Sequence, residues 1–233
     1  MKPTDMPLAA FDLETTGPDP LTCRIVTASI VRIGADRSTL ADEWLLDPGI
    51  EIPEGAAKVH GITTEHAREH GIDYATGIEQ ILDAVGQLWD DGHLVVVMNA
   101  PFDVTILDRE GKRVLGRSDY CPGALFDPLV VDKRADRYRK GGRTLTDLAR
   151  VYKVRQDNAH QSTGDCLTTA RVAWRMLRVL EPLSRIETTD QLMQLQQQWR
   201  AEQQDSLRAF WQGRGDERWR TVSSDWPLIG ADS

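Results

Sequence analysis

Cysteine, long apolar runs and positive charge are all scarce in this sequence of 233 residues. The three cysteines, at positions 23, 121 and 166, are odd in number and lack CxxC spacing, so we expect neither disulfides nor a structural zinc site. No apolar run approaches the ~20 residues that a membrane span needs, and the first residues lack the apolar core of a signal peptide. We therefore expect a cytoplasmic protein that does not contact a membrane.

The charge balance is acidic. The 36 Asp and Glu residues outnumber the 28 Lys and Arg residues, which gives a net charge of -8. This excess argues against a protein that coats nucleic acid passively, whereas an enzyme that handles nucleic acid through metal ions needs carboxylates. Basic residues are concentrated in one segment, where they either contact phosphates or form a solvated surface: Lys133, Arg134, Arg137, Arg139, Lys140 and Arg143.

Alternating strand and helix patterns indicate an α/β fold. Three β-rich segments separated by turns predict an antiparallel meander, with one strand ending near Asp12 and the others at 24–33 and 39–46. The continuous apolar run at 94–98 is typical of a buried parallel strand, and a short strand is predicted near 124–126. Helices are predicted at 76–89, 102–110, 144–152 and from Ser162 or Thr163 to about residue 180.

The composition changes after residue 182. The Gln-rich segment 188–212 carries apolar residues at helical spacing and predicts an amphipathic helix. The last residues are polar and rich in turns, but Trp226 and Leu228 indicate docking onto the main domain or onto a partner. We therefore predict a main domain at 1–182 and a C-terminal helical extension and tail at 183–233.

Two carboxylates stand at the end of the first strand. Asp12 and Glu14 are two residues apart, so they share one face of the strand while Leu13 points into the core. Two like charges held so close repel unless a cation joins them or one is protonated. Oxygen ligands suit a hard divalent ion such as Mg²⁺ or Mn²⁺. The alternative is a strand end with two solvated acids.

Three more candidates follow the later elements. Asp103 lies in the first turn of a helix after a parallel strand, where ligands of α/β sheets gather, although Asp also complements the helix dipole there. His160 lies on a loop five residues before Asp165, which starts the next predicted helix. Each residue is ambiguous alone. Their order along the chain favours one shared site.

Four separated motifs carry a resemblance: FDLETTG at 11–17, VHGIT at 59–63, NAPFD at 99–103 and HQSTGD at 160–165. In order and spacing they resemble the DEDDh family of 3′–5′ exonucleases, which includes proofreading epsilon subunits of bacterial DNA polymerase III. The resemblance covers about residues 7–180. It implies a ribonuclease H-like mixed five-stranded sheet, a three-strand antiparallel meander plus parallel strands, flanked by helices and followed by the C-terminal helical extension.

The resemblance also implies a mechanism with two divalent metal ions, Mg²⁺ or Mn²⁺. Asp12 would bind both ions, Glu14 and Asp165 would complete one of them, and Asp103 would support the other. His160 would be the general base, because the ordinary pKa of histidine suits proton removal near neutral pH.

Contacts with the terminal nucleotide are implied for Leu13, Thr15, Thr16, Val59, His60, Asn99 and Phe102. Two of these have a simpler alternative, since Phe102 suits core packing and His60 suits anchoring a turn. We expect removal of nucleotides from 3′ ends of single-stranded DNA, in proofreading or repair, with a polymerase or another protein as a partner through the tail. An RNA-trimming exoribonuclease of the same family, or a non-catalytic module that binds nucleic acid or bridges to a polymerase, is the alternative.

Overall fold

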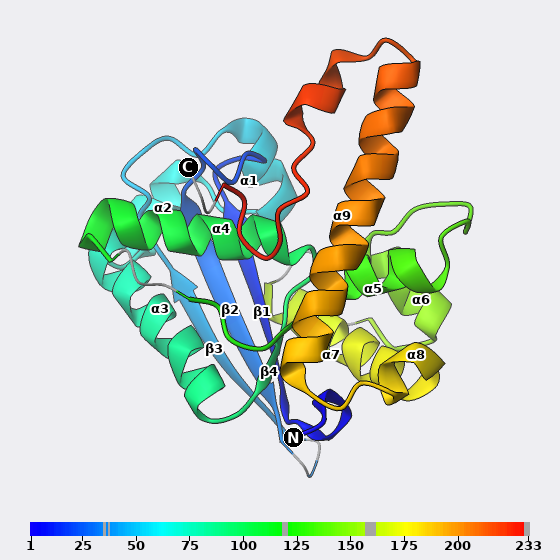
Figure 1. The fold of residues 1–233 in the computed structure, drawn as a ribbon. Helices are drawn as coiled ribbons and strands as arrows, with labels where there is room; N and C mark the ends of the chain where they lie inside the picture. Colours follow the sequence, from blue (N-terminus) through cyan, green and yellow to red (C-terminus); the bar gives the residue numbers. More distant parts are fainter. Residues whose placement is uncertain (35, 37, 118–120, 157–161, 231–233) are drawn as a thin grey trace.

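A computed structural model describes residues 1–233 except 35, 37, 118–120, 157–161 and 231–233, and except the side chains of Ser162 and Pro182. A five-stranded mixed sheet, in the order β3-β2-β1-β4-β5, forms its centre (Figure 1). The strands are β1 (Leu8–Thr15), β2 (Ile25–Ile33), β3 (Thr39–Leu45), β4 (Leu94–Val96) and β5 (Leu125–Phe126). The first three are antiparallel and the last two run parallel to β1, so the predicted mixed sheet is confirmed.

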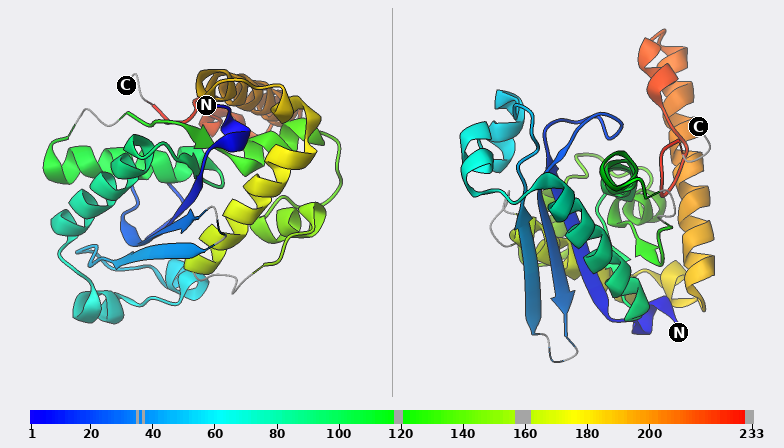
Figure 2. Two further views of the ribbon diagram at one scale, coloured as in Figure 1. Left: turned by 90° about the horizontal axis from the view of Figure 1, so that it is seen from below. Right: turned by 90° about the vertical axis from the view of Figure 1, so that its left-hand side faces the viewer.

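Helices cover both faces of this sheet. Helix α7 (Ser162–Val179) packs on β1 and β2 from one side, while α3 (Tyr74–Asp90) and α4 (Ala100–Glu110) lie on the other (Figure 2). In α3 the apolar residues recur every three or four positions and are buried, because one face of an amphipathic helix then meets the sheet. Across the described ranges, none of the helices combines the length and apolar character needed to span a membrane.

The central strand determines where the functional side chains lie. β1 pairs antiparallel with β2 and parallel with β4, and its first four residues are all buried. The carboxyl ends of β1 and β4 therefore reach the same end of the sheet. The register of β1 against β2 shifts between Glu14 and Thr15, so the strand bends just beyond its two acids.

Several helices have no counterpart in the sequence prediction. Helices α1 (Glu54–His60) and α2 (Thr64–His70) follow the meander and are seven residues long, too short for a clear apolar period. They close over Val26 beside the end of the sheet in a small separate apolar cluster. Also unpredicted are a π-helical turn (Gly111–Leu115), α5 (Pro128–Ala135), α8 (Glu181–Ser184) and single turns at Pro3–Asp5 and Glu217–Thr221. α6 (Leu145–Tyr152) begins at the predicted threonine cap.

The C-terminal extension packs on the main domain. Helix α9 (Thr189–Gly213) begins with a capping box and contacts α5 and β5. Its buried residues include Leu192 and Trp199, which belong to the main core. The tail then returns across α4, where Trp226 is buried and the backbone N–H of Ile229 donates to Thr105 Oγ1 at 2.9 Å. The prediction that the tail docks is confirmed for these residues, while the boundary near residue 182 stays a prediction.

Candidate active site

Asp12 and Glu14 lie on β1 at the end of the sheet where α4 and α7 begin. Leu13 between them is buried, as predicted, and both acids remain partly accessible. Protein atoms nevertheless surround the Asp12 carboxyl group. Burial, followed by the charges of Asp103, Glu14 and Asp165, raises the pKa of Asp12 well above its ordinary value.

Asp103 is joined to the same strand by a hydrogen bond. It lies in the first turn of α4 and is buried, and its Oδ1 accepts the backbone N–H of Leu13 at 3.0 Å. Burial raises the pKa of Asp103 to about 8, against the opposing effect of that N–H group. The nearby charge of Glu14 contributes to the rise. A helix-dipole role alone does not explain an acid that is buried beside two others.

The third acid comes from α7. Asp165 is in the first turn of that helix, and its charge contributes to the raised pKa of Asp12. The next residue, Cys166, is fully buried, and its Sγ donates to the backbone oxygen of Ser29 at 3.3 Å. This thiol therefore fixes the start of α7 against β2, directly across from Asp12 in the strand register.

A further acid near this site was not predicted. Glu43 on β3 pairs in register with Ser29, which pairs with Asp12, so the three share one row and one face of the sheet. Glu43 accepts a hydrogen bond from the Thr163 hydroxyl at the start of α7. The sequence of 39–46 alone did not single out Glu43, because the row that it joins depends on the register of β3 against β2.

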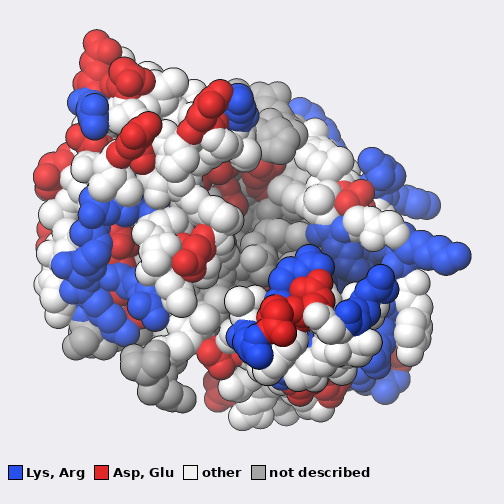
Figure 3. Space-filling view, turned by 90° about the horizontal axis from the view of Figure 1, so that it is seen from above, with Lys and Arg blue, Asp and Glu red and all other residues white. Residues whose placement is uncertain are grey.

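The acids at this end of the sheet form an electrostatically strained group. Seen from above, acidic side chains lie in a hollow at this end of the molecule (Figure 3). Within the ranges that the structure covers, no three carboxylate, histidine or cysteine side chains already converge as a complete metal-ligand set. The charges of Glu14, Asp103 and Asp165 are still close enough to raise the pKa of Asp12, and the charge of Glu14 raises that of Asp103. Carboxylates that raise one another's pKa in a buried place suit divalent cations, which remove the repulsion.

The structure describes one of the two histidines of the predicted site. His160 lies outside the described residues. His60 ends α1, and its Nδ1 accepts the backbone N–H of Ile62 at 3.2 Å, so it does anchor a turn. Its buried Nε2 has no hydrogen-bond partner among the described residues. Burial lowers the pKa of His60, against the effect of the Thr15 backbone beside it. One ring nitrogen thus serves the turn after α1, and the other is buried beside the strand end at Thr15.

The remaining predicted contacts differ in exposure. Thr15 and Thr16 are buried, and their hydroxyl groups bond the backbone of the turn that follows β1. Val59 on α1 is 58% exposed, which is unusual for valine and leaves it available to a ligand. Asn99 caps α4 in a left-handed conformation with φ of 62°. Phe102 is half-buried and packs against the core, so the simpler alternative for it holds at least in part.

Asp127, which no sequence pattern singled out, supports the whole β4–α4 turn. Its fully buried carboxylate caps α5 and also accepts the backbone N–H groups of Asn99 at 3.1 Å and Ala100 at 3.0 Å. The backbone N–H of Asp127 in turn donates at 2.7 Å to Gln196 Oε1 from α9. Helix α9 is therefore linked by hydrogen bonds to the turn that positions Asp103.

Comparison with known proteins agrees with this geometry. A family model described as exonuclease, RNase T, matches residues 9–173. A DNA polymerase III subunit epsilon-like protein of Rhodobacter capsulatus is 28% identical over 176 residues, which is 73% of this chain and 24% of that protein. A PolC-type DNA polymerase III of Listeria innocua is 23% identical over 81% of this chain, and the chain spans 12% of its length.

Solved structures share the fold. E. coli exonuclease I in complex with a dT13 oligonucleotide has a TM-score of 0.57 and 19% identity, covering 76% of this chain and 42% of that one. The same enzyme with a dA16 oligonucleotide has a TM-score of 0.59 and 20% identity, covering 77% and 42%. These similarities confirm the predicted ribonuclease H-like fold.

Proposed function

The chain belongs to the RNase T exonuclease family, and from that premise we propose that it removes nucleotides from 3′ ends of single-stranded nucleic acid. One observation carries the proposal. Asp12, Glu14, Asp103 and Asp165 come from three elements to one end of the sheet, where burial and mutual repulsion raise the pKa of Asp12 and Asp103. A protein gains nothing in stability from such an arrangement unless a ligand of positive charge binds there.

These residues fit divalent metal ions, which the family typically uses. Asp12, Glu14 and Asp165 would hold one ion, and Asp12 with Asp103 would hold the second. The donors are all carboxylate oxygens, which favours Mg²⁺ or Mn²⁺ over softer ions. When bound, two such ions lower the pKa of water and stabilise charge on the entering and leaving oxygens.

The chain's own residues would then manage the proton and the substrate. Water would add to the phosphorus of the terminal nucleotide and give its proton to His160. The bond from that phosphorus to the 3′ oxygen of the preceding nucleotide would break, and the departing oxygen would take a proton from solvent. Leu13, Thr15 and Thr16 would face the terminal nucleotide from the strand end. The unpartnered Nε2 of His60 and the exposed side chain of Val59 support a contact from α1.

On the other side of the terminal nucleotide, the β4–α4 turn would complete the pocket. Asn99 and Phe102 are the two residues that we place there, and Phe102 would contact a base with the part of its ring that the core leaves accessible. The left-handed backbone at Asn99 brings this turn to the end of β4, next to the strand that carries Asp12.

We propose DNA as the preferred substrate, because exonuclease I, which shares this fold, binds dT13 and dA16 oligonucleotides. A proofreading or repair role draws support from the polymerase relatives, and a polymerase or another protein would bind residues 183–233. Since α9 packs on the domain along one face, that partner would contact its exposed face. The exoribonuclease remains the second candidate.

A digestion assay tests the proposal. End-labelled single-stranded DNA, RNA and mismatched duplex would be incubated with Mg²⁺, with Mn²⁺ and with chelator. We expect a ladder that shortens by one nucleotide from the 3′ end, only with metal, and faster on DNA. Asp12→Asn should abolish it, whereas Asp83→Asn, an exposed acid on α3, should not. A ladder that persists with chelator or in the Asp12→Asn variant would contradict the proposal.

A further inference from the structure

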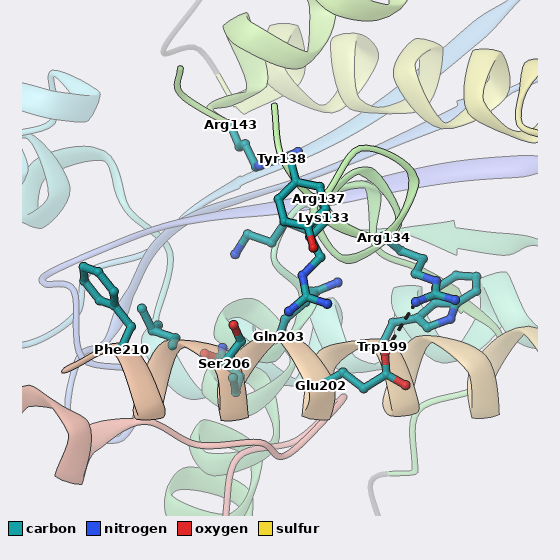
Figure 4. A pocket seen from close by; sticks show the side chains of 12 residues that line it. Lys133, Arg134, Arg137, Tyr138, Arg143, Trp199, Glu202, Gln203, Ser206 and Phe210 are labelled. Atoms are coloured by element: carbon teal, nitrogen blue, oxygen red, sulfur yellow. Dashed lines mark hydrogen bonds and ion pairs between the residues drawn. The ribbon is translucent and has the colours of Figure 1, made fainter. Parts of the chain in front are cut away.

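A second hollow lies beside the candidate active site and involves none of its residues. It is a cavity of about 480 Å³ between α9 on one side and α5 with the following 136–143 segment on the other. This segment holds most of the basic cluster that the sequence showed. Figure 4 shows the cavity with Lys133, Arg137 and Tyr138 near the middle of the view, Phe210 at one side and Trp199 with Arg134 at the other.

Two of its cations have no acidic partner. Arg143 pairs with Asp132, and Arg134 reaches Glu202 at 3.5 Å. By contrast, among the residues that the structure describes, neither Lys133 nor Arg137 forms an ion pair. Lys133 is only half exposed, and burial, together with the charge of Arg200, lowers its pKa. The charges of Asp127 and Asp132 oppose this shift without forming an ion pair with Lys133, and a bound anion would further offset the cost of the partly buried ammonium group.

A hydrogen-bond acceptor in the same cavity also lacks a partner. Gln203 Nε2 donates to the backbone oxygen of Val130 at 2.9 Å, which fixes the orientation of the amide. Its buried Oε1 has no donor among the described residues. An unsatisfied buried acceptor costs about 1–3 kcal/mol, and a ligand N–H would remove that penalty.

Aromatic rings complete the cavity wall. Tyr138 is 86% exposed and Phe210 is 55% exposed, which is unusual for rings of this size. Trp199 is buried at the base, with the guanidinium group of Arg134 5.9 Å from its ring centre. Exposed rings beside cations are the arrangement on which bases stack while their phosphates meet positive charge.

The cavity also lies on the correct side of the molecule. In the view from above, Lys and Arg side chains gather on both sides of the acidic hollow, and the group to its right lies on the side of α5 and the basic segment (Figure 3). A strand whose 3′ end enters the acidic hollow can therefore continue onto this positive surface.

We propose that this cavity binds one nucleotide unit, with its phosphate at Lys133 and Arg137, its base against Tyr138 or Phe210, and a base N–H at Gln203 Oε1. The unit is either an internal nucleotide of the strand being degraded or a released mononucleotide, since both present the same phosphate and base. The assignment to an internal nucleotide of the degraded strand rests on the proposed exonuclease function, whereas the chemistry by which the cavity binds phosphate and base does not.

Binding of a fluorescent dT12 oligonucleotide to the full chain, in chelator and over a range of salt concentrations, tests the site without hydrolysis. The Lys133→Met/Arg137→Met variant should bind about tenfold more weakly, and the slope of log affinity against log salt should fall by about 0.7, which is the change for one lost phosphate contact on a single strand. The control Arg178→Met/Arg185→Met carries the same charge change on α7 and beyond α8, and it should match the wild type.

Gln203→Met removes the acceptor without changing charge. It should weaken dT12 binding several-fold and leave the salt slope unchanged, provided that its unfolding midpoint shows an intact fold. Competition identifies the source: thymidine monophosphate displaces dT12 if the cavity takes free nucleotide, and only oligonucleotides displace it if the cavity takes the strand.

Two results would overturn the proposal: binding of dT12 by Lys133→Met/Arg137→Met that equals the wild type, or an equal loss in the control variant. The outcome is independent of catalysis. A wild type that binds dT12 through these residues but hydrolyses nothing rejects the exonuclease and retains the site. If the wild type hydrolyses DNA while the double variant binds dT12 normally, the exonuclease function is retained and the cavity site is rejected.

Discussion

Replacing Asp127 by alanine should destabilise the protein more than the loss of an ordinary helix cap. The change removes the cap of α5 and also the acceptor for the backbone N–H groups of Asn99 and Ala100. Ala100 is fully buried, so its N–H cannot turn to water. We expect the turn that precedes Asp103 to lose its fixed position, and activity to fall together with stability.

The magnitude follows from these contacts. A lost cap costs about 1 kcal/mol, and two buried donors without an acceptor cost about 1–3 kcal/mol each. Burial raises the pKa of Asp127, against the effect of the N–H groups of Asn99 and Val130, so removing the carboxylate also relieves a desolvation cost. The lower end of the sum, about 3 kcal/mol, is therefore the expected loss, which is large against a typical total stability of about 5–15 kcal/mol.

Asp73→Ala is the matched control. Asp73 also caps a helix, α3, through the backbone N–H of Thr76 at 2.9 Å, but it is exposed and supports no second turn. It should cost about 1 kcal/mol and leave activity unchanged. Asp127→Ser, which keeps a short acceptor for the cap of α5 alone, should recover about 1 kcal/mol of the loss in Asp127→Ala.

Urea unfolding, followed by the fluorescence of the seven tryptophans, measures these differences. If the unfolding free energy of Asp127→Ala depends on urea concentration as steeply as that of the wild type, a lower urea midpoint identifies a loss of stability in the folded state. If Asp127→Ala and Asp73→Ala unfold at the same urea concentration, the N–H groups of the β4–α4 turn do not depend on Asp127, and the reasoning fails.

Three further predictions concern the acids, the base and the extension. The pKa of Asp103 is raised to about 8 and that of Asp12 is also raised, so the folded state holds protons that the unfolded chain releases above about pH 4. In chelator the melting temperature should therefore fall from pH 5 to pH 9, and Mg²⁺ should reverse the fall. A flat profile in chelator would contradict this. His160→Ala should reduce kcat at least about 100-fold with unchanged melting, and a near-normal kcat would reject the base assignment. The fragment 1–182, expressed alone, should be insoluble or less stable than the full chain. Gln196→Leu in the full chain should lower the urea midpoint, because it removes the hydrogen bonds to Asp127 and Leu125. A fragment 1–182 with the stability of the full chain would instead point to a partner for the extension.

The parts of the site predicted from sequence are those that local pattern can locate. Asp12 and Glu14 mark a strand end, and Asp103 and Asp165 mark helix starts, because each position follows from the element that precedes it. The mixed sheet was predictable for the same reason. Segments rich in β-forming residues and separated by turn residues define the meander, and a continuous apolar run defines the parallel strand β4.

The residues that escaped prediction depend on register or on distant contacts. Glu43 reaches the row of Asp12 only because β3 pairs with β2 in one register, and a slip of one residue would send it to the other face. Asp127 follows a strand of two residues, which is too short to show any period. Its bond to Gln196 joins positions 69 apart in the chain, so no local pattern contains it.

A physical reason connects these supporting residues with the acids. The carboxylates repel one another, so the elements that carry them would separate unless other contacts hold them. The Leu13 N–H bond to Asp103 ties α4 to β1, and the Cys166 thiol ties α7 to β2. The Asp127 carboxylate then fixes the turn before α4, and the Asp127 backbone N–H is bonded to Gln196 on α9. Part of the stability of the C-terminal extension is thus used to hold a site that opposes folding, which explains why α9 is bonded to the domain through buried polar groups as well as apolar ones.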